Sequence, residues 1–209
     1  MSEELGKIEK PEVSSFKKDR RLLQVPLIYS GPESPSDYVE ILGRYWQQAG
    51  EQIDKLENSL GSITRVLHET LIVGGRDGLD MLARLNSYSH DIVSRKCKDG
   101  VGLECIEDRE LLEEVLDWER CLITGLISQK VARQVYESYN AASHKRFEQM
   151  GKDIDEKLKD GDVAVLFIRE GHLVQFPSDM DVFSVSPPAL DELRRWAREQ
   201  TMKKEPKQE

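Results

Sequence analysis

The sequence of residues 161–188 is GDVAVLFIREGHLVQFPSDMDVFSVSPP, and this stretch decides the fold of the chain. It opens with six consecutive apolar residues, Val163 to Ile168, which are mostly β-branched or aromatic. Successive side chains of a strand point to opposite faces of the sheet, so a strand that is apolar at every position needs a cover on both faces. The pattern therefore predicts a central strand at residues 163–168.

Two shorter apolar runs follow this strand. A turn at Glu170-Gly171-His172 leads to Leu173 to Phe176, which we expect to form a hairpin with the first strand. Pro177 ends that run, because proline cannot donate a hydrogen bond to a sheet. A third strand is expected at Val182 to Val185, and the prolines at 187 and 188 are typical of the first turn of a helix.

Long helices are expected before this unit. Apolar residues recur every three or four positions from Tyr38 to Leu60, so a helix from Ser36 or Asp37 to Leu60 has one apolar face. The longest helix should begin after Ser128 and run to about Lys159, with Val131 and Val135 among its core positions and a break near Gly151. The remaining segments predict strands at 22–29, 62–68 with an extension at 71–73, and 101–106. They predict helices at 74–98, with a kink expected near Asn86-Ser87, and at 107–124.

These elements predict an α/β or α+β fold, in which a mixed sheet of about four to six short strands is covered by long amphipathic helices. We expect a disordered N-terminal arm at 1–21, a single α/β domain at 22–200 with a possible sub-boundary near 125–128, and a disordered tail at 201–209. The arm ends in a charged cluster, Lys17-Lys18-Asp19-Arg20-Arg21, that resembles a solvated basic segment.

The composition narrows the class of partner and the compartment. The net charge of −9 argues against broad binding to nucleic acid or to an anionic membrane, since both are polyanions. No apolar run approaches the roughly 18 residues needed for a transmembrane helix. The three cysteines, Cys97, Cys105 and Cys121, have no metal-site or disulfide spacing, which favours reduced thiols and a cytoplasmic location.

One group of residues could carry chemistry. His68 and Glu69 end a predicted strand, where open α/β sheets place functional groups, and His172 lies in a turn beside Glu170. Imidazole and carboxylate groups can bind a divalent metal or transfer protons. The alternative is that these are ordinary polar residues, because the sequence contains no metal-binding spacing and does not require the two segments to meet.

A second weak site is the glycine-rich turn before the helix at 74–98. Backbone amides of Gly74, Gly75 and Arg76 could hold an anion at the helix N-terminus. The turn matches neither the dinucleotide-binding nor the phosphate-loop pattern, so a simple tight turn is the competing interpretation. No cofactor follows from the sequence.

The function that these observations favour is a cytosolic, non-enzymatic interaction or regulatory protein, self-associating or binding a protein partner through its long helices. One alternative is a metal-dependent or acid/base enzyme of small molecules that uses His68, Glu69 and His172. Another is a nucleic-acid or ribosome-associated factor that uses the basic arm. The basic residues Arg133, Lys145 and Arg146 are expected on a solvated helix face.

Overall fold

The computed structural model describes residues 20–204 of the 209-residue chain. Its elements run in the order β1 (Arg20–Pro26), α1 (Ser36–Leu60), β2 (Arg65–His68), α2 (Gly75–Leu85), α3 (Ser87–Lys98), β3 (Gly102–Glu104), α4 (Arg109–Ile123), α5 (Gln129–Lys157), β4 (Val163–Ile168), β5 (Met180–Ser184) and α6 (Pro188–Lys204). The described strands form one five-stranded sheet in the order β3-β2-β4-β1-β5, and all neighbouring strands are parallel. The predicted α/β class is confirmed.

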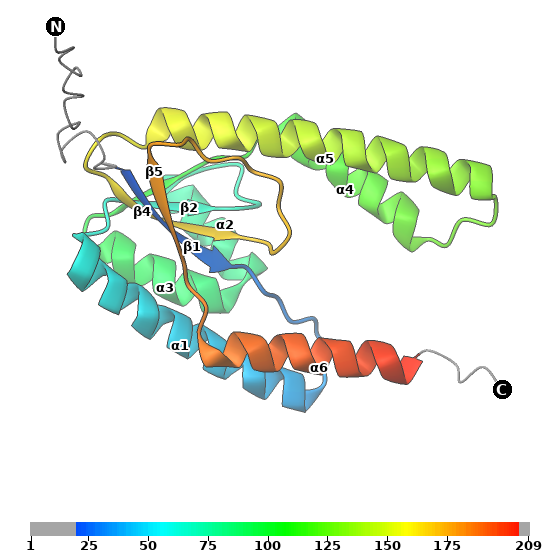
Figure 1. The fold of residues 1–209 in the computed structure, drawn as a ribbon, viewed down its shortest axis with the longest axis horizontal. Helices are drawn as coiled ribbons and strands as arrows, with labels where there is room; N and C mark the ends of the chain where they lie inside the picture. The colour runs from blue at the N-terminus through cyan, green and yellow to red at the C-terminus, as the bar shows by residue number, and fades with distance from the viewer. Residues whose placement is uncertain (1–19, 205–209) are drawn as a thin grey trace, which may run out of the picture.

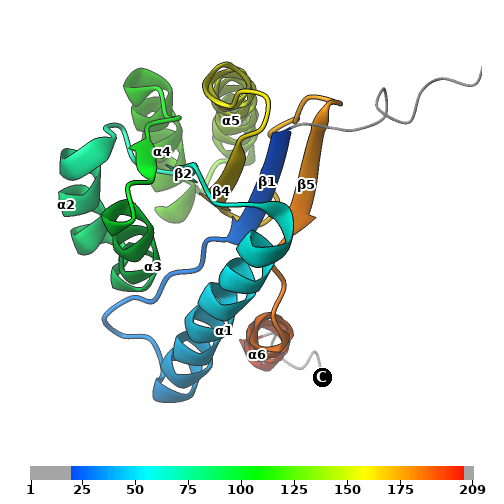
Figure 2. The same cartoon turned by 90° about the vertical axis from the view of Figure 1, so that its left-hand side faces the viewer.

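The central strand is β4, as its apolar run predicts, and all six of its residues are buried. Val163, Val165 and Phe167 face a core shared with α1, α2, α3 and α6. The alternate side chains face a second core shared with α5. Figure 2 shows these layers, with α1 and α3 on one side of the strands and α5 on the other. One strand thus supplies both cores because each of its faces is covered.

The predicted hairpin after β4 is wrong. Leu173 to Phe176 form no strand, and β5 pairs in parallel with β1 instead. The physical reason is that β1 and β2 occupy both edges of β4, so the returning chain has no strand edge to bind. The chain from Arg169 to Asp179, which we call the strap, crosses the α5 face of the sheet before it enters β5.

The long helix α5 is continuous, so the predicted break at Gly151 is also wrong. Glycine serves close packing at this position. A Cβ atom on Gly151 would lie 3.1 Å from the carbonyl oxygen of Gln175, so the absent side chain lets the strap approach the helix. The gain from this contact offsets the cost of about 1 kcal/mol that glycine carries inside a helix.

The two ends of the described chain differ from the predicted domain limits. Arg20 and Arg21 belong to β1 and not to a disordered arm. Arg20 is 8% exposed, and its guanidinium lies 2.6 Å from carboxylate oxygens of both Asp155 and Asp179. This pairing fixes the start of the strand, so Arg20 is not part of a solvated basic cluster. The rest of the predicted arm, residues 1–19, and residues 205–209 of the predicted tail lie outside the described residues, while residues 201–204 continue α6.

Two smaller predictions also need correction. The expected strand extension at 71–73 is not formed, because a turn at residues 69–70, where Thr70 has a positive φ of 75°, redirects the chain directly after β2. The helix predicted at 74–98 is two helices, α2 and α3, separated at Asn86. The Asn86 side chain caps α3 by accepting hydrogen bonds from the backbone of Tyr88 and Ser89. A side-chain cap competes with helix continuation, and here it starts a new helix.

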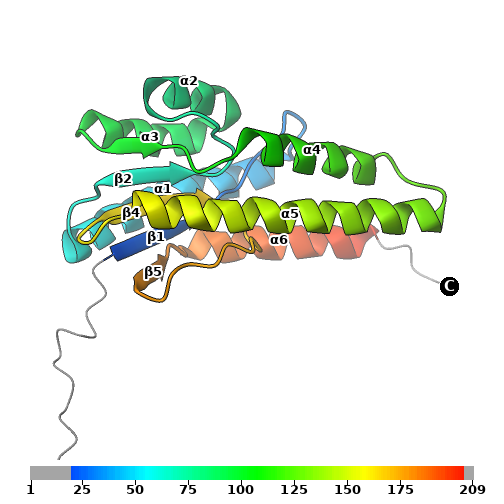
Figure 3. The same ribbon diagram turned by 90° about the horizontal axis from the view of Figure 1, so that it is seen from above.

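The possible sub-boundary at 125–128 is the loop of a helical hairpin formed by α4 and α5. In Figures 1 and 3, α4 and the N-terminal half of α5 lie side by side and extend beyond the ends of the strands. Most of the apolar face predicted for α4 is only partly buried, and Leu112 and Val115 are its buried residues. No helix among residues 20–204 is long and apolar enough to cross a membrane.

Candidate functional site

Five charged residues form a cluster at the carboxyl ends of β2 and β4. We call Glu69, Glu107, Glu119, Arg146 and Arg169 the edge cluster. Arg146 of α5 has its Nη2 atom 2.9 Å from Glu69 Oε1 and its Nε atom 3.0 Å from Glu107 Oε2. Arg169 also bonds Glu69, and its Nη1 atom lies 3.1 Å from Glu119 Oε1. The cluster therefore joins the sheet edge to both helices of the hairpin.

The edge cluster lies where open α/β sheets usually bind ligands, at the carboxyl ends of neighbouring strands. The chain leaves β2 toward one edge of the sheet, at β3, and leaves β4 toward the other edge, at β5. A crevice forms between neighbouring strands whose connections diverge in this way, outside their carboxyl ends. Glu69 follows β2 directly and Arg169 follows β4, so both stand at this point. Here the crevice is occupied by the protein's own ion pairs.

The electrostatics of the edge cluster favour a fixed structural role. The side chains of Glu69, Glu107 and Arg146 are all 1% exposed or less. Burial lowers the pKa of Arg146, but hydrogen bonds and charge from Glu107 and Glu69 raise this pKa by more, so the guanidinium stays charged. Arginine does not exchange protons near neutral pH. The cluster can hold elements in place, whereas acid/base catalysis needs a group that changes its charge.

His68 lies under the edge cluster on the opposite face of the sheet. It is fully buried, it stacks on Phe167, and its ring contributes to the side that packs on α1 and α3. Its Nδ1 atom lies 2.5 Å from the backbone oxygen of Glu69, which can only accept a hydrogen bond, so Nδ1 carries the proton. Burial lowers the pKa of His68 to about 4 despite the neighbouring Glu69. The imidazole is therefore neutral at pH 7.

His172 holds the strap to the other face of the sheet, where its ring contacts Phe147 and Phe176. Its Nδ1 atom accepts a hydrogen bond of 3.2 Å from the backbone N–H of Val174. The proton of the neutral ring must then be on Nε2, which lies 2.5 Å from the side-chain amide of Gln24. The Gln24 atom recorded at this contact is the amide nitrogen, which cannot accept a hydrogen bond, so the amide group must be turned over to present its oxygen. Both ring nitrogens are thus used in anchoring the strap.

The predicted constellation of His68, Glu69, His172 and Glu170 is not assembled into one site. His68 faces α1 and α3, whereas Glu69 and His172 face α5. Glu170 points elsewhere and pairs with Arg194 of α6. Burial lowers the pKa of His172, and the charge of Glu69 opposes this shift. Glu69 is the one member that belongs to the edge cluster.

The glycine-rich turn at Gly74, Gly75 and Arg76 starts α2, as predicted. A Cβ atom on Gly74 would lie 2.6 Å from the backbone oxygen of Leu103, so glycine is needed for the close approach of the turn to β3. Packing alone accounts for this glycine. Anion binding at the turn stays a prediction, and no group of three or more potential metal ligands occurs among residues 20–204.

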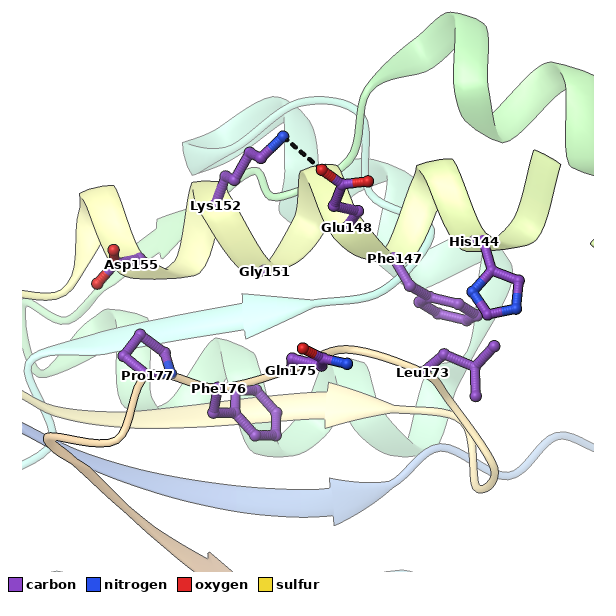
Figure 4. Close-up of a pocket in the computed structure, with 10 residues that line it drawn as sticks. All are labelled: His144, Phe147, Glu148, Gly151, Lys152, Asp155, Leu173, Gln175, Phe176 and Pro177. Carbon is purple, nitrogen blue, oxygen red and sulfur yellow. Dashed lines mark hydrogen bonds and ion pairs between the residues drawn. The ribbon is translucent and has the colours of Figure 1, made fainter. Parts of the chain in front are cut away.

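A cavity of about 550 Å³ lies between α5 and the strap (Figure 4). Its wall has apolar side chains from the strap, Leu173 and Phe176, and polar side chains from α5. The charged groups of this wall, Glu148, Lys152 and Asp155, have partners. Lys152 Nζ lies 2.8 Å from Glu148 Oε1, the contact that Figure 4 marks, and Asp155 pairs with Arg20. The cavity therefore offers a shallow mixed surface with no free charged cluster.

The tip of the hairpin has the opposite character. Ile123, Ile127 and Val131, which we call the tip patch, are 83%, 101% and 45% exposed. The sequence pattern wrongly assigns Val131 to the core. The helix partner α4 ends at Ile123, so little of the chain remains to cover Val131. Arg146 shows the reverse error, because it is 2% exposed although its helix face was expected in solvent.

No family model, curated protein or solved structure matches this chain. A function must therefore be inferred from the geometry of the molecule. Two features stand out in that geometry: the edge cluster, where buried charges fix the base of the hairpin, and the tip patch, where apolar side chains meet solvent.

Proposed function

We propose that this protein is a non-enzymatic interaction protein and that the α4–α5 hairpin is its docking element. The observation that carries the proposal is the tip patch, because three branched aliphatic side chains are exposed together at the end of a projecting pair of helices. Scattered exposed apolar residues are ordinary, but three that occupy or flank one loop at the end of a protruding element are typical of a protein-binding surface. An amphipathic helical surface of this kind binds another helix or groove.

The edge cluster supports the same proposal. A buried ion network is a poor source of stability, since removing charges from water offsets most of their attraction. Such a network does restrict orientation, and this one connects β2 and β4 to both helices of the hairpin. A hairpin held at a fixed angle loses less conformational entropy when it binds. The cluster thus prepares the tip patch for docking.

The two alternative functions have less support. A metal-dependent or acid/base enzyme based on His68 and His172 would need the imidazoles to meet, and they face opposite sides of the sheet. A nucleic-acid factor based on the basic arm would lose Arg20, which is ion-paired inside the fold. The cytoplasm remains the proposed location, and the free thiols of all three cysteines fit a reducing compartment.

Site-specific photo-crosslinking tests the proposed function without assuming which partner binds. A photoreactive amino acid replaces Ile127 in the full chain, and the matched control places it at Met202 of α6, which is 70% exposed. After irradiation of the cells that produce the protein, we expect one discrete crosslinked product from position 127 and no corresponding product from position 202. Equal labelling at both positions, or none at position 127, would contradict a docking role for the tip.

A further inference from the structure

The surface around the tip patch has a defined charge as well as exposed apolar groups. Lys130 and Arg133 follow the loop on α5, both are exposed, and neither has an ion-pair partner among residues 20–204. Ile127 beside them is fully exposed. A surface complementary to the tip must therefore be partly apolar and acidic, since opposite charges across an interface favour association and like charges oppose it.

The α4 helix of this same chain has that character. Its sequence holds five carboxylates and two arginines, which gives a net charge of −3. Glu110 and Glu114 are exposed on neighbouring turns of α4, and neither has an ion-pair partner among residues 20–204, whereas Glu113 pairs with Arg109. Leu111, Trp118 and Leu122 are only partly buried and are spaced by seven and four residues, so they share one face of the helix. The flank of α4 is thus both acidic and partly apolar.

Resting on the proposed function, we infer that the partner of the hairpin is a second copy of this chain, with the two hairpins side by side and antiparallel. The direction follows from the placement of charge. α4 runs toward the tip, so Glu110 and Glu114 lie in the half of α4 nearer the sheet, whereas Lys130 and Arg133 lie at the tip (Figure 3). In the antiparallel arrangement the basic tip of each copy meets the acidic flank of the other.

The competing arrangement joins the two copies tip to tip. It would bring Lys130 and Arg133 of one copy against the same residues of the other, and like charges in direct contact are unfavourable. The antiparallel arrangement avoids this repulsion and uses both surfaces twice, as a two-fold interface requires. The hairpins would overlap along α4, whose 15 residues span about 22 Å. Four helices then pack together, and each hairpin covers the other's exposed apolar groups.

Sedimentation equilibrium of the full chain measures this association directly. An interface limited to one pair of hairpins lies at the small end for specific complexes, so we expect a dimer with a dissociation constant on the order of micromolar. Ile127→Asp places a charge in the contact and should weaken the dimer at least about tenfold. Met202→Asp, the same change at another exposed apolar residue outside the hairpin, should leave the dissociation constant unchanged.

A charge-exchange experiment tests the antiparallel direction. One variant reverses the tip with Lys130→Glu and Arg133→Glu, and a second reverses the flank with Glu110→Lys and Glu114→Lys. Each variant alone should dimerise at least about tenfold more weakly, because both of its contacts become repulsive. A mixture of the two should recover the wild-type affinity, because every tip in the heterodimer again faces a flank of opposite charge. All four positions lie on exposed helix surface, so folding is retained.

The outcomes separate this inference from the function on which it rests. A wild-type dimer that Ile127→Asp weakens, but that the mixture of reversed variants does not restore, would overturn the antiparallel arrangement and retain the docking role. A wild-type chain that is monomeric up to about 1 mM, with crosslinks from position 127 to a different protein, would overturn self-association alone. A monomer without such crosslinks would overturn both.

Discussion

The α4–α5 hairpin buries charged side chains at its base and exposes apolar side chains at its tip. At the base, Arg146 and the carboxylates of Glu69 and Glu107 are withdrawn from water. At the tip, Ile123 and Ile127 are exposed to it. Stability alone favours the reverse distribution, since burying charge is costly and burying aliphatic groups is favourable. This distribution supports the proposal that the base fixes an orientation and that the tip binds a partner.

The largest effect on stability is expected from removing the buried charge of Arg146 at the base of the hairpin. Arg146→Met removes the shared partner of Glu69 and Glu107 and leaves carboxylates buried without their counter-ion. We expect the free energy of unfolding in urea to fall by about 3–5 kcal/mol. Lys145→Met, at the exposed neighbouring position of the same helix, is the matched control and should change it by less than about 0.5 kcal/mol.

A triple variant sharpens this result. Adding Glu69→Gln and Glu107→Gln to Arg146→Met removes the stranded charges, so at least half of the lost stability should return. An Arg146→Met protein as stable as the wild type would show that the edge cluster is not desolvated. The distinction between base and tip would then disappear.

The next effect concerns pH and His68, which is buried on the sheet face opposite the edge cluster. The pKa of His68 is lowered to about 4 by burial, below the value of 6.5 expected when the chain is unfolded. The unfolded state therefore binds the proton first as the pH falls. The stability that depends on the neutral imidazole is complete above about pH 6.5 and is lost on acidification toward pH 4, and it amounts to about 3 kcal/mol.

Unfolding curves between pH 7 and pH 4 measure this loss. His68→Gln keeps a polar side chain at the position without a titrating group, so the variant should start less stable and lose less on acidification. If the wild type and His68→Gln decline in parallel, the pH dependence arises from other groups and the buried neutral state of His68 is incorrect.

Much of the fold was predictable because some segments have only one way to bury their apolar groups. Val163 to Ile168 must be covered on both faces, and the apolar face of α1 needs a sheet or helix to lie on. The failed prediction at Leu173 to Phe176 has a different cause. That segment is apolar enough for a strand, but its place depends on which strand edges are already occupied, and this is a property of the assembled sheet.

The site was less predictable because its contacts are distant in the sequence. His68 and Glu69 were correctly placed at a strand end, but the bond between Arg146 and Glu69 joins residues 77 positions apart. Nothing adjacent to Arg146 distinguishes it from the exposed Lys145. The tip patch is equally hidden, because Val131 continues the apolar spacing of α5 beyond the point where α4 can cover it. The periodicity of a helix predicts which face a residue lies on. It does not predict how far the neighbouring helix extends to cover that face.

A smaller effect on stability is expected from shortening an apolar side chain of α4, and its size should differ between the base and the tip of the hairpin. Leu112 lies in the buried part of α4 and is 6% exposed. Leu112→Ala removes buried methyl groups and leaves a cavity, so the free energy of unfolding should fall by about 2–3 kcal/mol. A loss below about 1 kcal/mol in urea unfolding would indicate that the base of the hairpin is as loosely packed as its end.

The smallest effect on stability is expected at Ile123, eleven residues further along α4 and 83% exposed. Ile123→Ala removes aliphatic surface that already contacts water, so the free energy of unfolding of the monomer should change by less than about 0.5 kcal/mol. Alanine also favours the helix slightly more than isoleucine does. The measurement must be made well below the dissociation constant, because dimer formation would add its own stabilisation. If stability falls at high concentration only, the exposed isoleucine contributes to association and not to the fold, and the two ends of the hairpin have separate roles.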